Sequence, residues 1–115
     1  MTVSERAVGG VVLLDVAGQL TLGDGADRLR DKVRSLLQGG QKQFLVNLAA
    51  VSYMDSAGLG ELVQAYATTK KQGGTLKLMN ITSRLRDLLV ITKLAAVFDS
   101  YDNEAAALAS FAAPV

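Results

Sequence analysis

The sequence contains no cysteine and no histidine. Without cysteine there is no disulfide, no thiol nucleophile and no thiolate metal site, and nothing indicates an oxidising compartment. Without histidine the chain lacks the most common general base and the most common transition-metal ligand. These absences argue against ordinary enzyme chemistry, and we predict a protein that is not an enzyme and needs no cofactor.

The sequence also lacks tryptophan, a long hydrophobic run and a dense cluster of one charge. No apolar stretch approaches the roughly 18 residues that span a bilayer, and no signal segment opens the chain. Twelve basic residues are interspersed with eleven acidic ones, for a net charge of +1. A nucleic-acid binder normally shows a basic stripe and exposed stacking aromatics. We therefore expect a soluble, cytoplasmic protein that binds neither nucleic acid nor a membrane.

Half of the 115 residues are hydrophobic, which is enough for the core of one domain. We therefore predict a single domain over residues 1–115. Short β-branched and apolar runs predict strands at about residues 2–7, 10–18, 44–48, 76–79 and 97–101. Apolar residues at helical spacing predict four helices between them and after the last. Strands that alternate with helices indicate an α/β fold with a mostly parallel sheet, covered by helices on one or both faces.

The predicted helices have recognisable ends. Asp24 is placed to cap the first helix, and two consecutive glycines, Gly39 and Gly40, end it. The second helix begins near Ser56 and runs to about residue 72, while residues 49–55 connect the preceding strand to it. Thr82 or Ser83 caps the third helix, and Asn103 caps the fourth.

Ser56 is the centre of the candidate site, because it lies at a helix N-terminus just past the end of a buried strand. Open α/β sheets place functional groups there, where the helix dipole favours negative charge. A purely structural reading is also open, since Asp55 and Ser56 are both favoured N-cap residues worth about 1 kcal/mol. Gly58 and Gly60 each cost roughly 1 kcal/mol in a helical first turn. Either close packing against a strand or the approach of a partner would explain them.

Other chemistries fit the same residues poorly. The residues around Ser56 do not form a nucleophile elbow, and no histidine is present to act as its base. The two glycines of this helix lack the lysine and hydroxyl residue of a nucleotide-binding loop. Asp24 and Asp55 alone are too few for a metal site, so we predict none. A phosphate on Ser56, by contrast, would add about −1.5 to −2 charges and could act as a switch.

The segment around Ser56 resembles the STAS domain, named for sulfate transporters and anti-sigma factor antagonists. The resemblance starts at Asn47-Leu48, continues through the helix that ends at Gly73-Gly74 and covers nearly the whole chain. Its most specific part is the run Val51-Ser52-Tyr53-Met54-Asp55-Ser56-Ala57-Gly58-Leu59-Gly60. The resemblance implies a mixed, mostly parallel sheet of four or five strands with about four helices.

The resemblance also implies a function. In free-standing STAS proteins, the serine directly after the aspartate is phosphorylated by an anti-sigma factor that is also a serine kinase. By its position in the motif that serine is Ser56. The unphosphorylated form binds the anti-sigma factor and so frees the sigma factor. A serine phosphatase regenerates this unphosphorylated form. The chain is therefore expected to be an anti-sigma factor antagonist that switches partners. A second reading is a constitutive scaffold or subunit of a signalling or transport assembly.

Two departures from the family pattern concern the partner-facing surface. Where many antagonists have Gly-Glu-Leu-Asp, this chain has Gly18-Gln19-Leu20-Thr21, so one acidic contact is missing. Ala57 replaces a serine that is common in the family, which leaves Ser56 as the single hydroxyl at the motif. We expect the partner-binding surface to include Thr21, Asp24, Asp55, Ala57, Gly58, Leu59 and Gly60.

Overall fold

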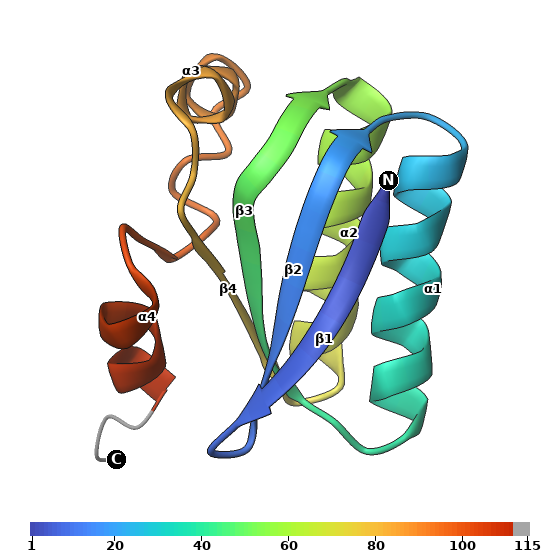
Figure 1. Ribbon diagram of the computed structural model, residues 1–115, viewed down its shortest axis with the longest axis vertical. Coiled ribbons are helices and arrows are strands. Elements are labelled where there is room, and N and C mark those ends of the chain that lie inside the picture. The colour runs from blue at the N-terminus through green and yellow to red at the C-terminus, as the bar shows by residue number, and fades with distance from the viewer. Residues whose placement is uncertain (112–115) are drawn as a thin grey trace.

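One five-stranded sheet runs through the protein in the spatial order β1-β2-β3-β4-β5, as Figure 1 shows for the first four. The structure, a computed structural model, describes residues 1–111. The strands are β1 (Thr2–Val8), β2 (Val11–Leu20), β3 (Gln43–Met54), β4 (Thr75–Met79) and β5 (Ser100–Tyr101). β1 and β2 are antiparallel, whereas the other three pairs are parallel. The predicted mixed, mostly parallel sheet is thus confirmed.

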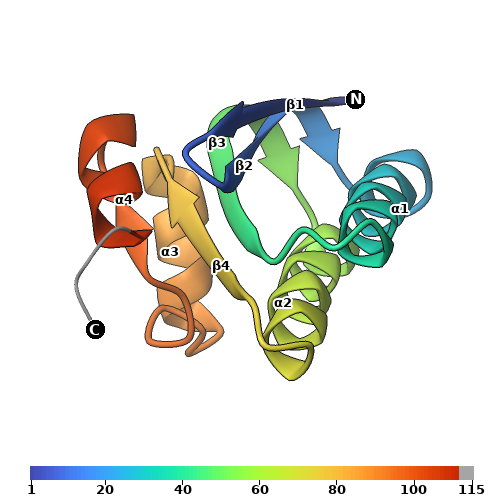
Figure 2. The same cartoon turned by 90° about the horizontal axis from the view of Figure 1, so that it is seen from below.

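The four helices cover both faces of this sheet (Figure 2). They are α1 (Asp24–Gln38), α2 (Ser56–Lys71), α3 (Ser83–Ile91) and α4 (Glu104–Phe111). Alternate residues of β2 point to opposite faces: Val12 and Leu14 join the larger core with α1, α2 and α3, and Leu13 joins a smaller core under α4. Residues 11–14 are therefore all apolar because the strand is covered by a core on each face.

The helix ends follow local sequence chemistry in most places. The Thr82 hydroxyl accepts a hydrogen bond from the backbone N–H of Leu85 at 3.3 Å, and Asn103 Oδ1 accepts one from Ala106 at 2.8 Å. Both predicted caps are confirmed. Asp24 does not cap α1, because Gly23 occupies the N-cap with φ of 88° and Asp24 is the first helical residue.

The strands differ more from the sequence prediction. β2 continues two residues past Gly18, and β3 continues beyond Leu48 to Met54, where the sequence predicts a connection. The reason is pairing between the two strands, since residues 50, 51, 53 and 54 of β3 pair with residues 17–20 of β2. Gly18, with φ of 101°, lies at an irregularity of this register. β5, in contrast, is only two residues long.

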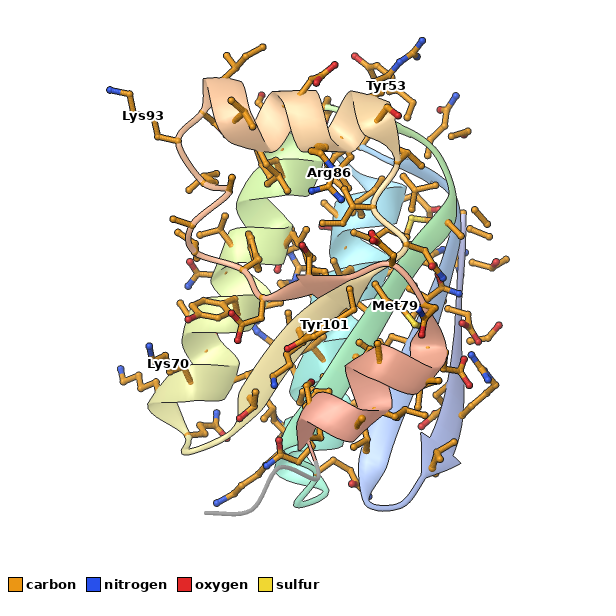
Figure 3. All side chains as sticks on the ribbon, turned by 90° about the vertical axis from the view of Figure 1, so that its left-hand side faces the viewer. Tyr53, Lys70, Met79, Arg86, Lys93 and Tyr101 are labelled. Carbon is orange, nitrogen blue, oxygen red and sulfur yellow. The ribbon has the colours of Figure 1, made fainter. Side chains whose placement is uncertain are left out.

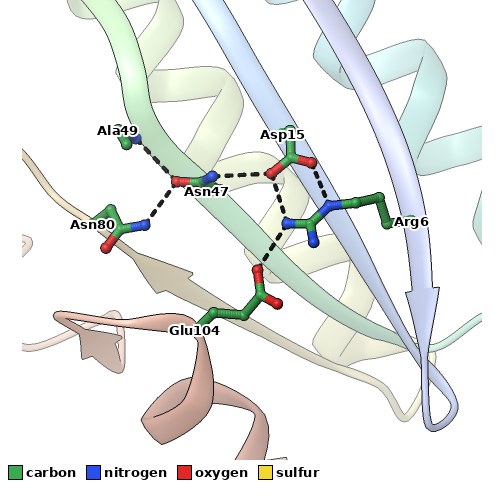
Figure 4. A network of polar contacts seen from close by, with 6 residues as sticks. All are labelled: Arg6, Asp15, Asn47, Ala49, Asn80 and Glu104. Atoms are coloured by element: carbon green, nitrogen blue, oxygen red, sulfur yellow. Dashed lines mark hydrogen bonds and ion pairs between the residues drawn. The ribbon is translucent and has the colours of Figure 1, made fainter.

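A polar network holds α4 against the strands (Figure 4). Arg6 Nε donates to Asp15 Oδ2 at 2.6 Å, and Arg6 Nη2 donates to Glu104 Oε1 at 2.8 Å. Asn47 Nδ2 donates to Asp15 Oδ1 at 2.9 Å, and Asn80 Nδ2 donates to Asn47 Oδ1 at 3.1 Å. The hydrogen bond from Arg6, more than that from Asn47, holds the pKa of Asp15 below its ordinary value. The network therefore links four strands or their ends to the last helix.

This network makes the stability of the protein depend on acid pH. The folded pKa of Asp15 lies below the unfolded value of about 4. Its contribution is therefore fully present above that pH and is lost as the pH falls through the folded pKa. We expect Asp15→Asn to lower the free energy of unfolding at pH 7 by at most about 1 kcal/mol, because solvent screens exposed pairs. Urea unfolding at a series of pH values should show the difference from the parent disappear in acid. A difference that stays constant with pH would contradict the assignment.

Candidate functional site

The candidate site lies at one edge of the sheet, where β2 and β3 end and α1 and α2 begin, at the top of Figure 1. We call this end of the sheet, made up of residues 21–23, Asp55 and the first turn of α2, the carboxyl edge. Because β2 and β3 are parallel, their C-terminal ends reach it together. Residues 21–23 connect β2 to α1, and Asp55 alone connects β3 to α2. The two connections are therefore neighbours, although more than thirty residues separate them in the chain.

Asp55 holds the two connections together. Its Oδ1 accepts a hydrogen bond from the backbone N–H of Gly58 at 2.8 Å, and its Oδ2 accepts one from Leu22 at 3.0 Å. The bond from Leu22, followed by that from Gly58, lowers the pKa of Asp55, so the carboxylate is charged at neutral pH. Because each oxygen accepts from the backbone of a different connection, Asp55 fixes the position of the carboxyl edge, while its contact with a partner stays a prediction.

Ser56 is the first residue of α2 and is exposed to solvent. The N-cap is Asp55, so the structural reading left open by the sequence applies to the aspartate and not to the serine. Within residues 1–111, no hydrogen bond engages the Ser56 hydroxyl. The fold thus presents an exposed hydroxyl group at the positive end of a 16-residue helix, beside an ionised carboxylate.

The small residues after Ser56 divide into two groups. Gly58 is buried, and a Cβ atom there would lie 1.9 Å from the carbonyl oxygen of Leu20. Leu59 is 5% exposed and belongs to the main core. Both residues are buried in the free protein, and close packing against the end of β2, one of the two explanations that the sequence leaves open, accounts for Gly58. Gly60 is exposed, and a Cβ atom there would meet no atom within 4 Å. Ala57 is half-buried.

The connection between β2 and α1 contributes an exposed apolar side chain to the carboxyl edge. Leu22 is 79% exposed, and its backbone is fixed by Asp55. Thr21 is half-buried, and its carbonyl accepts from the N–H of Ala26 at 3.0 Å. Asp24 is exposed and pairs with Arg28 at 2.8 Å on the surface of α1. Leu22 lies within the segment from Thr21 to Asp24 that the sequence assigns to this face, and it is the apolar side chain that the segment exposes there.

A groove opens beside the carboxyl edge, between the last part of β3 and α3. Its volume is about 510 Å³. Tyr53, labelled in Figure 3 and 49% exposed, lies on the β3 side, and Ile91, 77% exposed, lies on the α3 side. The remaining lining residues are Val51, Ser52, Met54, Thr82, Arg84, Leu85, Asp87 and Leu88. Sequence reasoning missed this groove because it treated residues 49–55 as a connection.

In the described part of the chain, no three acidic side chains lie close enough together to hold a metal ion. No helix among residues 1–111 is long and apolar enough to cross a membrane.

Comparison with known sequences identifies relatives over most of the chain. The STAS domain family model matches residues 3–107. The anti-sigma-B factor antagonist of Bacillus subtilis (strain 168) is 40% identical over 88 residues, which cover 76% of this chain and 79% of that protein. The anti-sigma F factor antagonist of Paenibacillus polymyxa is 28% identical over 100 residues, covering 86% and 85%. These relatives carry the names of regulators rather than of enzymes.

Solved structures share the fold. An anti-sigma factor antagonist from Mycobacterium paratuberculosis superposes with a TM-score of 0.80 at 22% identity, covering 95% of this chain and 92% of that one. The Bacillus cell fate determinant SpoIIAA in its phosphorylated form gives a TM-score of 0.76 at 19% identity, covering 96% and 99%. At these identities the likeness establishes the architecture alone, an α/β sheet with the same arrangement of helices.

Proposed function

Since this chain belongs to the STAS domain family, we propose that it is an anti-sigma factor antagonist controlled by phosphorylation of Ser56. The unphosphorylated protein binds an anti-sigma factor that is also a serine kinase, and so frees a sigma factor. Phosphorylation of Ser56 ends this binding, and a serine phosphatase restores it. The names of the two relatives, an anti-sigma-B and an anti-sigma F factor antagonist, support the general role.

The observation that carries the proposal is the state of the Ser56 hydroxyl. It is exposed at the first position of α2, and Asp55 already performs the capping that would otherwise explain a serine there. A kinase can therefore reach the hydroxyl without unfolding the helix, and its modification breaks no hydrogen bond among the described residues. The Ser56 hydroxyl is thus available to accept a phosphoryl group, while hydrogen bonds to Asp55 hold the neighbouring backbone in place.

Charge explains why phosphorylation acts as a switch. A phosphate adds about −1.5 to −2 charges next to the Asp55 carboxylate, which already accepts a hydrogen bond from the Gly58 amide in the first turn of α2. The helix dipole partly offsets that charge while it faces water. A partner docked on the same surface would have to bury it, and burial of an unpaired charge is strongly unfavourable. The free protein therefore tolerates the phosphate, whereas the complex does not.

Phosphorylation of the purified protein tests this function. We expect incubation with the cognate anti-sigma factor and ATP to add one phosphate to the parent and none to Ser56→Ala, measured by intact-mass spectrometry. Ser35→Ala is a suitable control, because Ser35 is also exposed but lies in the last turn of α1, away from the carboxyl edge. It should accept phosphate like the parent. If the parent stays unmodified with the kinase and in its native cells, the constitutive scaffold becomes the better reading.

A further inference from the structure

The last part of β3 has a strand on one side only. β3 is 12 residues long, but its pairing with β4 ends at Asn47 and Met79. Beyond Met79 the chain turns at Asn80, where φ is 59°, and enters α3. Within residues 1–111, residues 50, 51, 53 and 54 therefore pair with β2 alone. A strand edge of this kind is a template for the backbone of another chain.

The groove beside this edge has the form of a site for an extended segment. Residues 84, 87, 88 and 91 of α3 line it, which is the spacing of one helix face. Val51, Tyr53 and Met54 form the opposite wall. Leu88 and Ile91 are the apolar part of the helix face, and Ile91 is 77% exposed. Clustered exposed apolar side chains with a polar rim are typical of interaction sites.

The rim of the groove carries charges that the protein itself does not pair. In the described part of the chain, neither Arg84 nor Asp87 forms an ion pair, whereas the intervening Arg86 lies 3.8 Å from Asp102. Arg84 and Asp87 lie almost one helical turn apart on the groove. An occupant with apolar side chains and with an acidic and a basic residue at the same separation would complement this rim.

We propose that the groove binds an extended segment of the anti-sigma factor, which adds a strand to the open edge of β3. This inference rests on the proposed function. Backbone hydrogen bonds to residues 50–54 give affinity, and alternate apolar side chains fit between Tyr53 and Ile91. The groove is continuous with the carboxyl edge, because Met54 lines it and Ser56 follows two residues later. A phosphate on Ser56 therefore lies at the end of the bound strand.

A pair of neighbouring substitutions tests the groove. Ile91→Asp is expected to weaken binding to the purified anti-sigma factor at least about tenfold, as for a hot-spot residue. Val90→Asp is the control: Val90 is 60% exposed on the same helix but does not line the groove. It should change the dissociation constant less than about threefold. Because both side chains are exposed, both variants are expected to fold, which circular dichroism checks. Equal affinities of Ile91→Asp and the parent, measured by calorimetry, would overturn the proposal.

Hydrogen exchange distinguishes a bound strand from other occupants. In the complex, the backbone amides of residues 50–54 should exchange more slowly than in the free protein. Loss of affinity in Ile91→Asp without such protection would indicate a docked helix and overturn strand addition. Protection that rises with protein concentration alone would indicate a second copy and overturn it too. If the parent and Ile91→Asp both fail to bind the anti-sigma factor, the proposed function fails. If Ser56→Asp loses binding and Ile91→Asp does not, the groove is not the binding site, whereas the proposed function stands.

Discussion

Ser56→Asp is expected to abolish binding to the cognate anti-sigma factor, with a loss of affinity of at least about 100-fold. An unpaired charge buried at an interface costs about 3–5 kcal/mol, and each 1.4 kcal/mol is a factor of ten. The aspartate would stand beside the ionised Asp55, whose two oxygens already accept backbone hydrogen bonds. Titration calorimetry with the purified anti-sigma factor measures the change.

The fold of Ser56→Asp should remain intact. Position 56 is exposed and is the first residue of α2, where the helix dipole favours an acidic side chain. Ser56→Asn is the matched control, because asparagine has nearly the size of aspartate without its charge. We expect it to retain binding within about tenfold. The switch would be wrong if Ser56→Asp bound as tightly as the parent, or if Ser56→Asn lost as much affinity.

Gly58→Ala is expected to lower the free energy of unfolding by about 3 kcal/mol, a large value for one methyl group. An added Cβ would lie 1.9 Å from the carbonyl oxygen and 2.7 Å from the carbonyl carbon of Leu20. These are backbone atoms at the end of β2, so they cannot rotate away as a flexible side chain could. Either α2 or the strand must move, which would also disturb the contact between Asp55 and Leu22.

Gly60→Ala is the control for this prediction. A Cβ at Gly60 meets nothing within 4 Å, and the residue is exposed in the same helix. Alanine there should raise the free energy of unfolding by about 0.5–1 kcal/mol, because glycine is the poorer helix former. Denaturant unfolding of both variants should therefore give effects of opposite sign. Equal effects would show that the close approach to Leu20 does not limit position 58.

The sequence by itself determined the features that depend on near neighbours in the chain. Helical spacing located α1 and α2, and the Thr82 and Asn103 side chains marked the starts of α3 and α4. Ser56 was placed at a helix N-terminus from the adjoining strand and helix patterns alone. These features were predictable because periodicity, capping and turns involve residues a few positions apart.

Only the tertiary structure decided what depends on distant residues. β3 extends to Met54 because β2 pairs with it, and Gly58 is required because Leu20 lies against it. Asp55, rather than Ser56, caps α2 and also reaches Leu22, which fixes the connection of residues 21–23. The groove between β3 and α3 forms because β4 ends before β3 does. Such pairings join segments tens of residues apart, so their geometry follows from packing of the whole sheet and not from any local pattern.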